Sequence, residues 1–197
     1  MSATSAEQLA PRPHLQVLVL LGGLGCAAAL RSVVSGATGP QSVAGALVFS
    51  GCLAALCLAG GLSAPGRLSV SLLSGTAAAI GLAAVAVLRS GLASVAGRST
   101  AEFLPWMVVT TIVAISEEAF LRGTMFDLVQ RRGGETTAVL VCAAAFAALH
   151  VPLYGWRVVP LDVAVGLLFG TLRVMAASWT APAFAHVLAD AAGWWLR

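Results

Sequence analysis

Apolar segments long enough to cross a lipid bilayer follow one another along almost the whole chain. A membrane-spanning helix needs about 20 mainly apolar residues. Of the 197 residues, 59% are hydrophobic and only 10% are charged, whereas soluble domains carry about a quarter charged residues. A water-soluble core cannot enclose this much apolar surface, so lipid must cover the outside of the fold. The chain is therefore predicted to be an all-α integral membrane protein.

The apolar segments predict a polytopic bundle of about seven transmembrane helices that encloses a polar intramembrane cavity. Glycine, proline and serine residues typical of loops separate the segments. The predicted spans are residues 15–34, 42–62, 68–89, 103–124, 136–153, 158–173 and 175–196. No linker divides them, so residues 1–197 are predicted to form a single membrane domain. Within it, residues 1–100 are expected to be scaffold helices, and residues 101–197 hold most of the polar side chains.

The charges argue against nucleic-acid binding and leave the membrane orientation open. The net charge is +3, and all the cationic side chains are arginines scattered along the chain. Such a pattern does not form the basic face of a nucleic-acid-binding protein. Arginines divide evenly between the two ends of the predicted bundle, with Arg31 assigned to one of these ends. The positive-inside rule therefore does not set the orientation.

The stretch IVAISEEAFLRG, residues 112–123, places three ionisable side chains inside one apolar segment. Each costs about 2.5–3.5 kcal/mol at the centre of a membrane helix, so their presence favours a functional polar cavity. Glu118 and Arg122 are four residues apart and are predicted to form an ion pair on one helix face. Glu117 lies about 100° further round the helix, so it is free to face another group.

Two later apolar segments add histidines at helical spacing. Phe146 and His150 share a face in CAAAFAALHVPLYGW, and His186 and Asp190 share a face in PAFAHVLAD. Glutamate and histidine together can hold a divalent cation or can activate water by general base catalysis. The zinc-binding HExxH helix is absent, so a metal site would have to be assembled between helices.

Residues elsewhere are assigned to structural positions. Asp127 is predicted at the membrane interface, Asp162 in the first turn of a helix, and Glu102 in a loop. The five tryptophans are expected in the aromatic belts at the two membrane surfaces.

Polar residues that only lock helices together remain an alternative, as in a scaffold or immunity protein. A transporter or proton relay would use the same carboxylates, although the interrupted, repeated helices frequent in transporters are not seen.

Three motifs resemble those of the CPBP family of intramembrane proteases, which includes CAAX prenyl endopeptidases and bacteriocin-processing enzymes. EEAFLRG resembles the family's EExxxR motif, FAALH resembles FxxxH, and HVLAD resembles a histidine followed four residues later by Asn or Asp. The motifs occur in the family's order on three separate apolar segments within residues 103–195. Each motif alone is weak, but the three together are specific.

The resemblance implies that residues 101–197 are the catalytic core of a helical bundle around a polar cavity. The implied catalytic residues are Glu117, His150, His186 and Asp190, and the implied supporting residues are Glu118, Arg122 and Phe146. In this family, the first glutamate and the FxxxH histidine activate water, and the third motif lies where the oxyanion forms. Because an aspartate stands at position 190, it donates a hydrogen bond only if it is protonated, and otherwise orients His186.

The resemblance leaves the cofactor open, since the family is described both as metalloproteases and as glutamic proteases. A zinc ion takes at least three protein ligands, which here would come from Glu117, His150, His186 and Asp190. We favour the metal-free glutamic mechanism.

The sequence thus predicts a multi-pass intramembrane endopeptidase of a bacterial cytoplasmic membrane. Its partners are the lipid bilayer and a membrane-associated protein or peptide substrate, cut near its C-terminus or in a membrane-proximal segment. Maturation or removal of a C-terminal sorting signal is preferred, because bacteria generally lack protein prenylation. A CAAX-type prenyl-protein endopeptidase is the alternative within the enzyme class.

Overall fold

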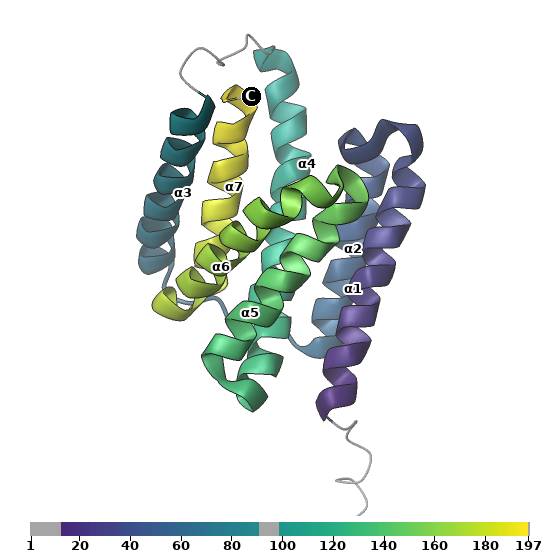
Figure 1. The fold of residues 1–197 in the computed structure, drawn as a ribbon, viewed down its shortest axis with the longest axis vertical. Coiled ribbons are helices and arrows are strands. Elements are labelled where there is room, and N and C mark those ends of the chain that lie inside the picture. Colours follow the sequence, from purple (N-terminus) through teal and green to yellow (C-terminus); the bar gives the residue numbers. More distant parts are fainter. Residues whose placement is uncertain (1–12, 91–98, 197) are drawn as a thin grey trace, which may run out of the picture.

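The computed structural model describes residues 13–90 and 99–196, and within them it contains helices and no strand (Figure 1). Seven α-helices correspond to the seven predicted segments. Their bounds are α1 (Pro13–Ser35), α2 (Val43–Gly60), α3 (Leu68–Ser90), α4 (Thr100–Glu118), α5 (Phe126–Tyr154), α6 (Val159–Ala176) and α7 (Thr180–Trp195). Two short 3₁₀ helices lie at Gly36–Gln41 and Trp156–Val158, and a π-helical segment, Ala119–Met125, joins α4 to α5. The all-α fold class is confirmed.

Five stretches of the described chain are long and apolar enough to cross a membrane. One of them, the 55 residues Thr100–Tyr154, contains both α4 and α5. The chain reverses within it at Gly134, whose φ of 79° is outside the helical range. α7 has only 16 residues, which at about 1.5 Å per residue is shorter than the bilayer core. Six of the seven α-helices thus make up the five stretches that meet the length and composition requirement for a span, and α7 lies outside them.

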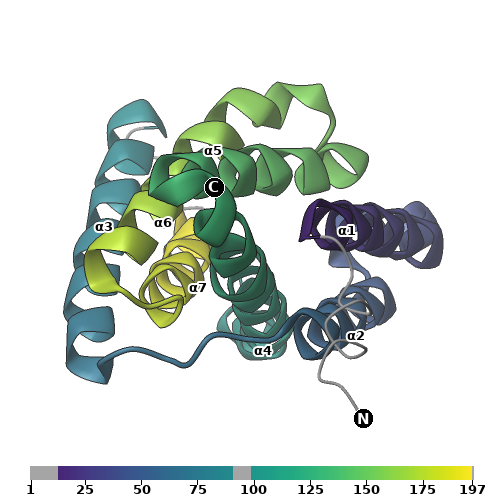
Figure 2. The same ribbon diagram turned by 90° about the horizontal axis from the view of Figure 1, so that it is seen from below.

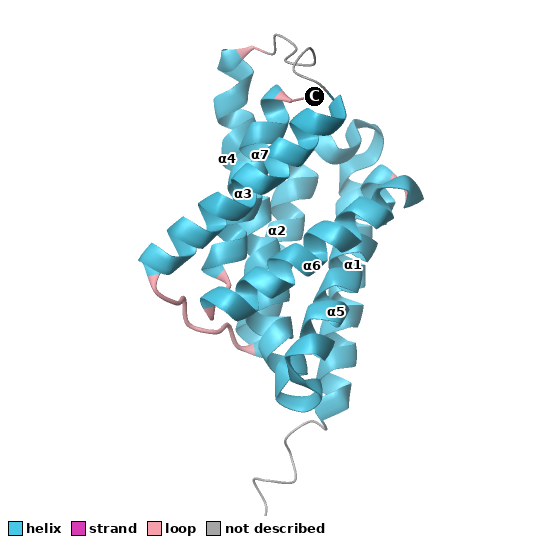
Figure 3. Cartoon of the chain, turned by 60° about the vertical axis from the view of Figure 1, so that its left-hand side comes forward, coloured by secondary structure: helices cyan, strands magenta, loops and turns pink. Residues whose placement is uncertain are grey.

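α4 lies at the centre of the bundle, which places its polar residues in the interior. It packs against α2 on one side and α7 on the other. α1 lies beyond α2, α3 lies beyond α7, and α5 with α6 covers one face of this row (Figure 2). The extended segment 61–67 carries the chain from α2 across the bundle to α3 (Figure 3).

Small residues let α5 and α6 approach closely. A Cβ atom added to Gly166 of α6 would lie 2.8 Å from the Cα atom of Ala143 in α5. Because no side chain separates the two backbones, α6 reaches far enough inward for the Gly166 carbonyl to meet Arg122. Close approach through small residues is the usual way for membrane helices to pack.

We expect Gly166→Ala to destabilise the protein, because the added methyl group would press against the backbone of α5. Overpacking of this kind costs about 1–3 kcal/mol. Thermal unfolding of the detergent-solubilised protein measures the effect. The matched control is Gly81→Ala in α3, where an added Cβ has nothing within 4 Å. Equal melting temperatures for the two variants would contradict the packing argument.

Candidate active site

The predicted ion pair between Glu118 and Arg122 is present and fully buried. Arg122 Nη1 donates to Glu118 Oε1 at 2.8 Å, and both residues are 0% exposed. Arg122 Nη2 donates to the Gly166 carbonyl at 3.1 Å. The guanidinium also lies 4.9 Å from the centre of the Phe146 ring, within the range of a cation–π contact. The pair therefore ties α4, α5 and α6 together.

The π-helical segment that carries Arg122 is held by side chains from outside it. Cys142 Sγ donates to the Leu121 carbonyl at 3.1 Å, and Arg173 Nε donates to the Arg122 carbonyl at 2.9 Å. Arg173 also binds Asp127 at 2.8 Å, an ion pair that the sequence analysis missed. π-helical turns inside α-helices are frequent at functional sites. Here the turn directly follows the two glutamates and carries Arg122.

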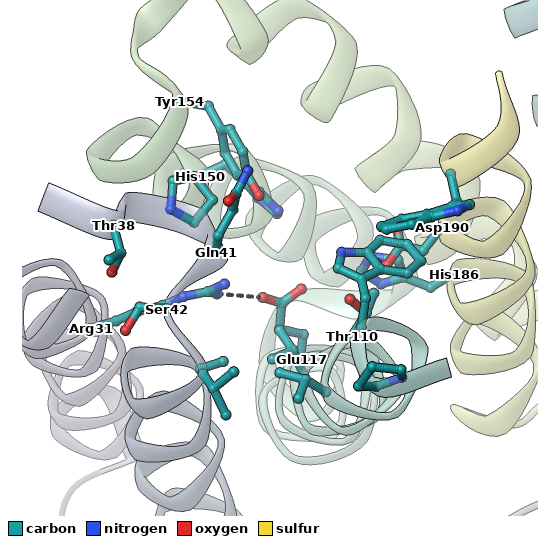
Figure 4. Close-up of a pocket in the computed structure, with 18 of the residues that line it drawn as sticks. Arg31, Thr38, Gln41, Ser42, Thr110, Glu117, His150, Tyr154, His186 and Asp190 are labelled. Atoms are coloured by element: carbon teal, nitrogen blue, oxygen red, sulfur yellow. Dashed lines mark ion pairs between the residues drawn. The ribbon is translucent and has the colours of Figure 1, made fainter. Parts of the chain in front are cut away.

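Glu117 faces away from the Glu118 pair and meets an arginine from the first helix. Its side chain is buried, and its Oε1 lies 3.7 Å from Nη1 of Arg31. A dashed line marks this ion pair in Figure 4. Arg31 is itself buried, with its guanidinium 4.9 Å from the Phe49 ring centre. The contact with Glu117 was not predicted for Arg31. Its position inside an apolar segment was the signal that could have found it.

One cavity of about 780 Å³ brings the predicted catalytic residues together. Residues from α1, α2, α4, α5 and α7 line it, together with the turn between α1 and α2. All four predicted catalytic residues are among them, namely Glu117, His150, His186 and Asp190. Figure 4 shows Glu117 near the middle, with Arg31 on one side and His186 on the other. The first and third motifs, which are more than 60 residues apart in the sequence, thus line the same cavity.

One side chain at this cavity, Glu102, differs from its sequence assignment. Glu102 lies in the first turn of α4 rather than in a loop, and it lines the cavity. Trp106 and Trp194 also line the cavity, and their ring centroids are 4.7 Å apart. These two tryptophans had been assigned to the aromatic belts. Because the cavity extends along α4 to its first turn, residues near the end of the helix become part of its wall.

One ring nitrogen of His150 contacts a backbone carbonyl, and the other is available as an acceptor. Its Nδ1 lies 2.8 Å from the Phe146 carbonyl oxygen and 3.8 Å from Oδ2 of Asp162. Since a carbonyl oxygen only accepts, Nδ1 carries the proton, and in the neutral ring Nε2 is the acceptor. Asp162 does lie in the first turn of α6, as predicted, but its proximity to His150 was missed. Neighbours of this kind fix the orientation of a histidine ring.

His186 connects the Glu118 pair to the third motif. Its Nδ1 lies 3.1 Å from Glu118 Oε1, and its Nε2 lies 3.7 Å from Asp190 Oδ2. Glu118 therefore binds both Arg122 and His186, rather than Arg122 alone. The Phe146 ring contacts both histidines, at centroid distances of 4.7 Å to His150 and 5.6 Å to His186. Phe146 therefore contacts Arg122 and both histidines.

The side chains do not assemble into a metal site. Within residues 13–90 and 99–196, no group of three or more His, Cys, Asp or Glu side chains comes together in a way that could hold a metal ion. Zinc ligation requires donor atoms about 2.0–2.2 Å from a common point. The four candidate ligands line the same cavity without sharing such a point, so the arrangement as it stands does not fit a zinc centre.

A buried ion pair, a second carboxylate that faces a cavity and two histidines thus lie together inside an apolar helical bundle. Residues 99–192, which contain all three motifs, match the family model described as type II CAAX prenyl endopeptidase Rce1-like. This part of the chain is therefore similar to the Rce1-like family, and the match confirms the family resemblance seen in the motifs. Comparison with curated proteins found no match, and comparison with solved structures found none.

We expect the Glu118–Arg122 pair to be strongly coupled, because either partner alone would be a buried charge without its counterion. Breaking such a pair costs about 3–5 kcal/mol. Arg122→Met and Glu118→Gln should each lower the thermal stability of the purified protein, and the double variant should cost less than their sum. Arg157→Met, at an exposed position, is the control and should leave stability unchanged. Strictly additive effects would refute the pair.

Proposed function

We propose that this protein is an intramembrane endopeptidase that cuts a membrane-associated protein or peptide by means of water activated by Glu117 and His150. The observation that carries the proposal is the pair of adjacent buried glutamates with different surroundings. Glu118 is held by Arg122 and His186. Glu117 lines the cavity together with His150, His186 and Asp190. One carboxylate is thus structural, and the other is available to a substrate.

The proposed reaction follows from what peptide hydrolysis requires. It needs a base for the attacking water, stabilisation of the oxyanion, and a proton for the leaving amine. Glu117 accepts a proton from water as the water oxygen bonds to the scissile carbonyl carbon. The carbon–nitrogen bond then breaks, and the proton returns from Glu117 to the amine. His150, with Nε2 as the acceptor, binds and orients the same water.

His186 and Asp190 are assigned to stabilising the negative charge that develops on the substrate. Nδ1 of His186 is directed at Glu118, so Nε2 is the ring nitrogen left for the cavity, and it donates a hydrogen bond when the ring is protonated. Asp190 lies 3.7 Å from that nitrogen and, as a carboxylate, only accepts hydrogen bonds. It therefore orients His186 rather than donating to the oxyanion itself. This is the expected consequence of an aspartate where some relatives have asparagine.

We place the enzyme in a bacterial cytoplasmic membrane and assign it to maturation or C-terminal processing of a secreted or surface protein. The alternative substrate is a prenylated C-terminal peptide, which the description of the matched family favours. Comparing the protein termini of membranes with and without this protein would identify the substrate and the cut. Matched reporter peptides with and without a prenyl group would then separate the two substrate classes.

We expect Glu117→Gln to abolish cleavage while leaving the protein folded, because glutamine keeps the shape but cannot accept the proton. Loss of general base catalysis costs about 10²–10⁴-fold in rate. The measurement is cleavage of the identified substrate by purified protein in lipid, and the control is Glu135→Gln at an exposed position outside the cavity. Cleavage by Glu117→Gln at the wild-type rate would remove this residue from the mechanism.

The metal-free mechanism makes its own prediction. Activity should survive incubation with EDTA and with 1,10-phenanthroline, and elemental analysis of the purified protein should find less than stoichiometric zinc. This expectation rests on the distance between the four candidate ligands, which share no coordination point. Stoichiometric zinc, together with activity that a chelator removes and added zinc restores, would overturn it.

A further inference from the structure

A buried arginine from outside the matched domain approaches the proposed base. Arg31 belongs to α1, whereas the family match begins at residue 99. The residue is 8% exposed, and its guanidinium lies against the Phe49 ring. An arginine is always charged and almost never buried without a partner. The neighbour recorded for its charge among the described residues is Glu117.

The contact between Arg31 and Glu117 is loose. Their nearest nitrogen and oxygen atoms are 3.7 Å apart, compared with 2.8 Å in the Arg122–Glu118 pair. Charge-assisted hydrogen bonds are typically about 2.7–2.9 Å long. Consistently, Glu117 Oε1 has no hydrogen-bond partner among the described residues. The guanidinium therefore has donors left for another acceptor placed beside Glu117.

Arg31 is also distinct in charge from the rest of the cavity wall. Among the described residues that line the cavity it is the one arginine, and no lysine occurs in the chain. The other ionisable lining residues are Glu102, Glu117, Asp190 and the two histidines. A substrate oxygen that becomes negative beside Glu117 therefore has one permanent cation within reach.

Hydrolysis transfers a negative charge from Glu117 to the substrate oxygen beside Arg31. When water attacks, its oxygen bonds to the scissile carbon, the π electrons of the carbonyl move to the carbonyl oxygen, and the proton goes to Glu117. Glu117 is neutralised as the substrate oxygen becomes an anion, so the charge facing Arg31 is transferred rather than created. A cation placed beforehand at such a point stabilises the transition state with little reorganisation.

We propose that Arg31 is a catalytic residue that binds the oxyanion of the tetrahedral intermediate. The proposal rests on the proposed peptidase function and adds a donor that neither the motifs nor the matched domain contains. It also accounts for Asp190, because a carboxylate at that position does not donate and a second donor is needed beside His186. Arg31 and His186 flank Glu117 from α1 and α7 (Figure 4).

The first test is kinetic and uses the full-length protein in lipid, with the reporter peptide established for the wild type. Arg31→Gln should lower kcat about 10²–10³-fold, as expected for loss of an oxyanion donor, with a smaller change in KM. Arg31→Lys should retain part of the activity, and guanidinium ion should partly restore Arg31→Ala. The control, Arg67→Gln at an exposed position, should cleave normally. A kcat within threefold of wild type for Arg31→Gln would overturn the proposal.

The second test measures binding and does not depend on turnover. The probe is the same peptide with a phosphonate in place of the scissile amide, which carries a negative charge where the oxyanion forms. Arg31→Gln should weaken phosphonate binding at least tenfold and leave binding of the cleaved peptide product unchanged. Glu117→Gln should bind the phosphonate at least as tightly as the wild type, since one negative charge is removed. Equal loss of phosphonate and product binding in Arg31→Gln would show a structural role and overturn the proposal.

The outcomes separate this inference from the proposed function. If the wild type cleaves, Glu117→Gln is inactive and Arg31→Gln is fully active, only the inference fails. If Arg31→Gln does not fold, Arg31→Lys decides, because it keeps the charge but loses the planar fork of donors. A folded Arg31→Lys variant with wild-type kcat and phosphonate affinity would then overturn the proposal. A wild type that cleaves no peptide rejects the proposed function itself.

Discussion

The buried Glu118–Arg122 ion pair is the interaction on which the rest of the site depends. Two charges removed from water gain little net stability even when they pair well, so such a pair more often contributes specificity than stability. Here the other contacts of the two side chains show which parts of the fold the pair positions. Arg122 binds the Gly166 carbonyl of α6, and Glu118 binds His186 of α7. A single ion pair therefore contacts both α6 and α7, and α7 lines the cavity.

The pair also explains why two adjacent carboxylates have different surroundings. Neighbouring residues on a helix point about 100° apart, so satisfying Glu118 within the helix directs Glu117 elsewhere. The π-helical segment after them is fixed by Cys142 and Arg173, which removes the freedom to rotate back. Glu117 is thereby held at the cavity without being neutralised by its own helix. In the proposed mechanism this is what keeps it available for water.

Much of the site was predictable because it depends on local spacing. The i,i+4 relation predicted the Glu118–Arg122 pair, and the motif order predicted that Glu117, His150 and His186 would meet. The contacts missed, Arg31 with Glu117 and Asp162 with His150, join residues far apart in the chain. Helical periodicity says which face a residue occupies but not which helix faces it. The contact between α1 and Glu117 was not predicted for that reason.

By itself, the sequence determined that the chain is a helical membrane protein, because apolar composition and segment length leave lipid as the only suitable surroundings. It also determined the family resemblance, because three motifs occur in order on separate helices, and residues 99–192 match that family's model. Only the tertiary structure decided which groups surround Glu117. Interhelical distances are set by small residues such as Gly166 and by buried polar contacts. These contacts depend on the packing of the whole bundle, so no single segment reveals that Arg31 belongs to the cavity.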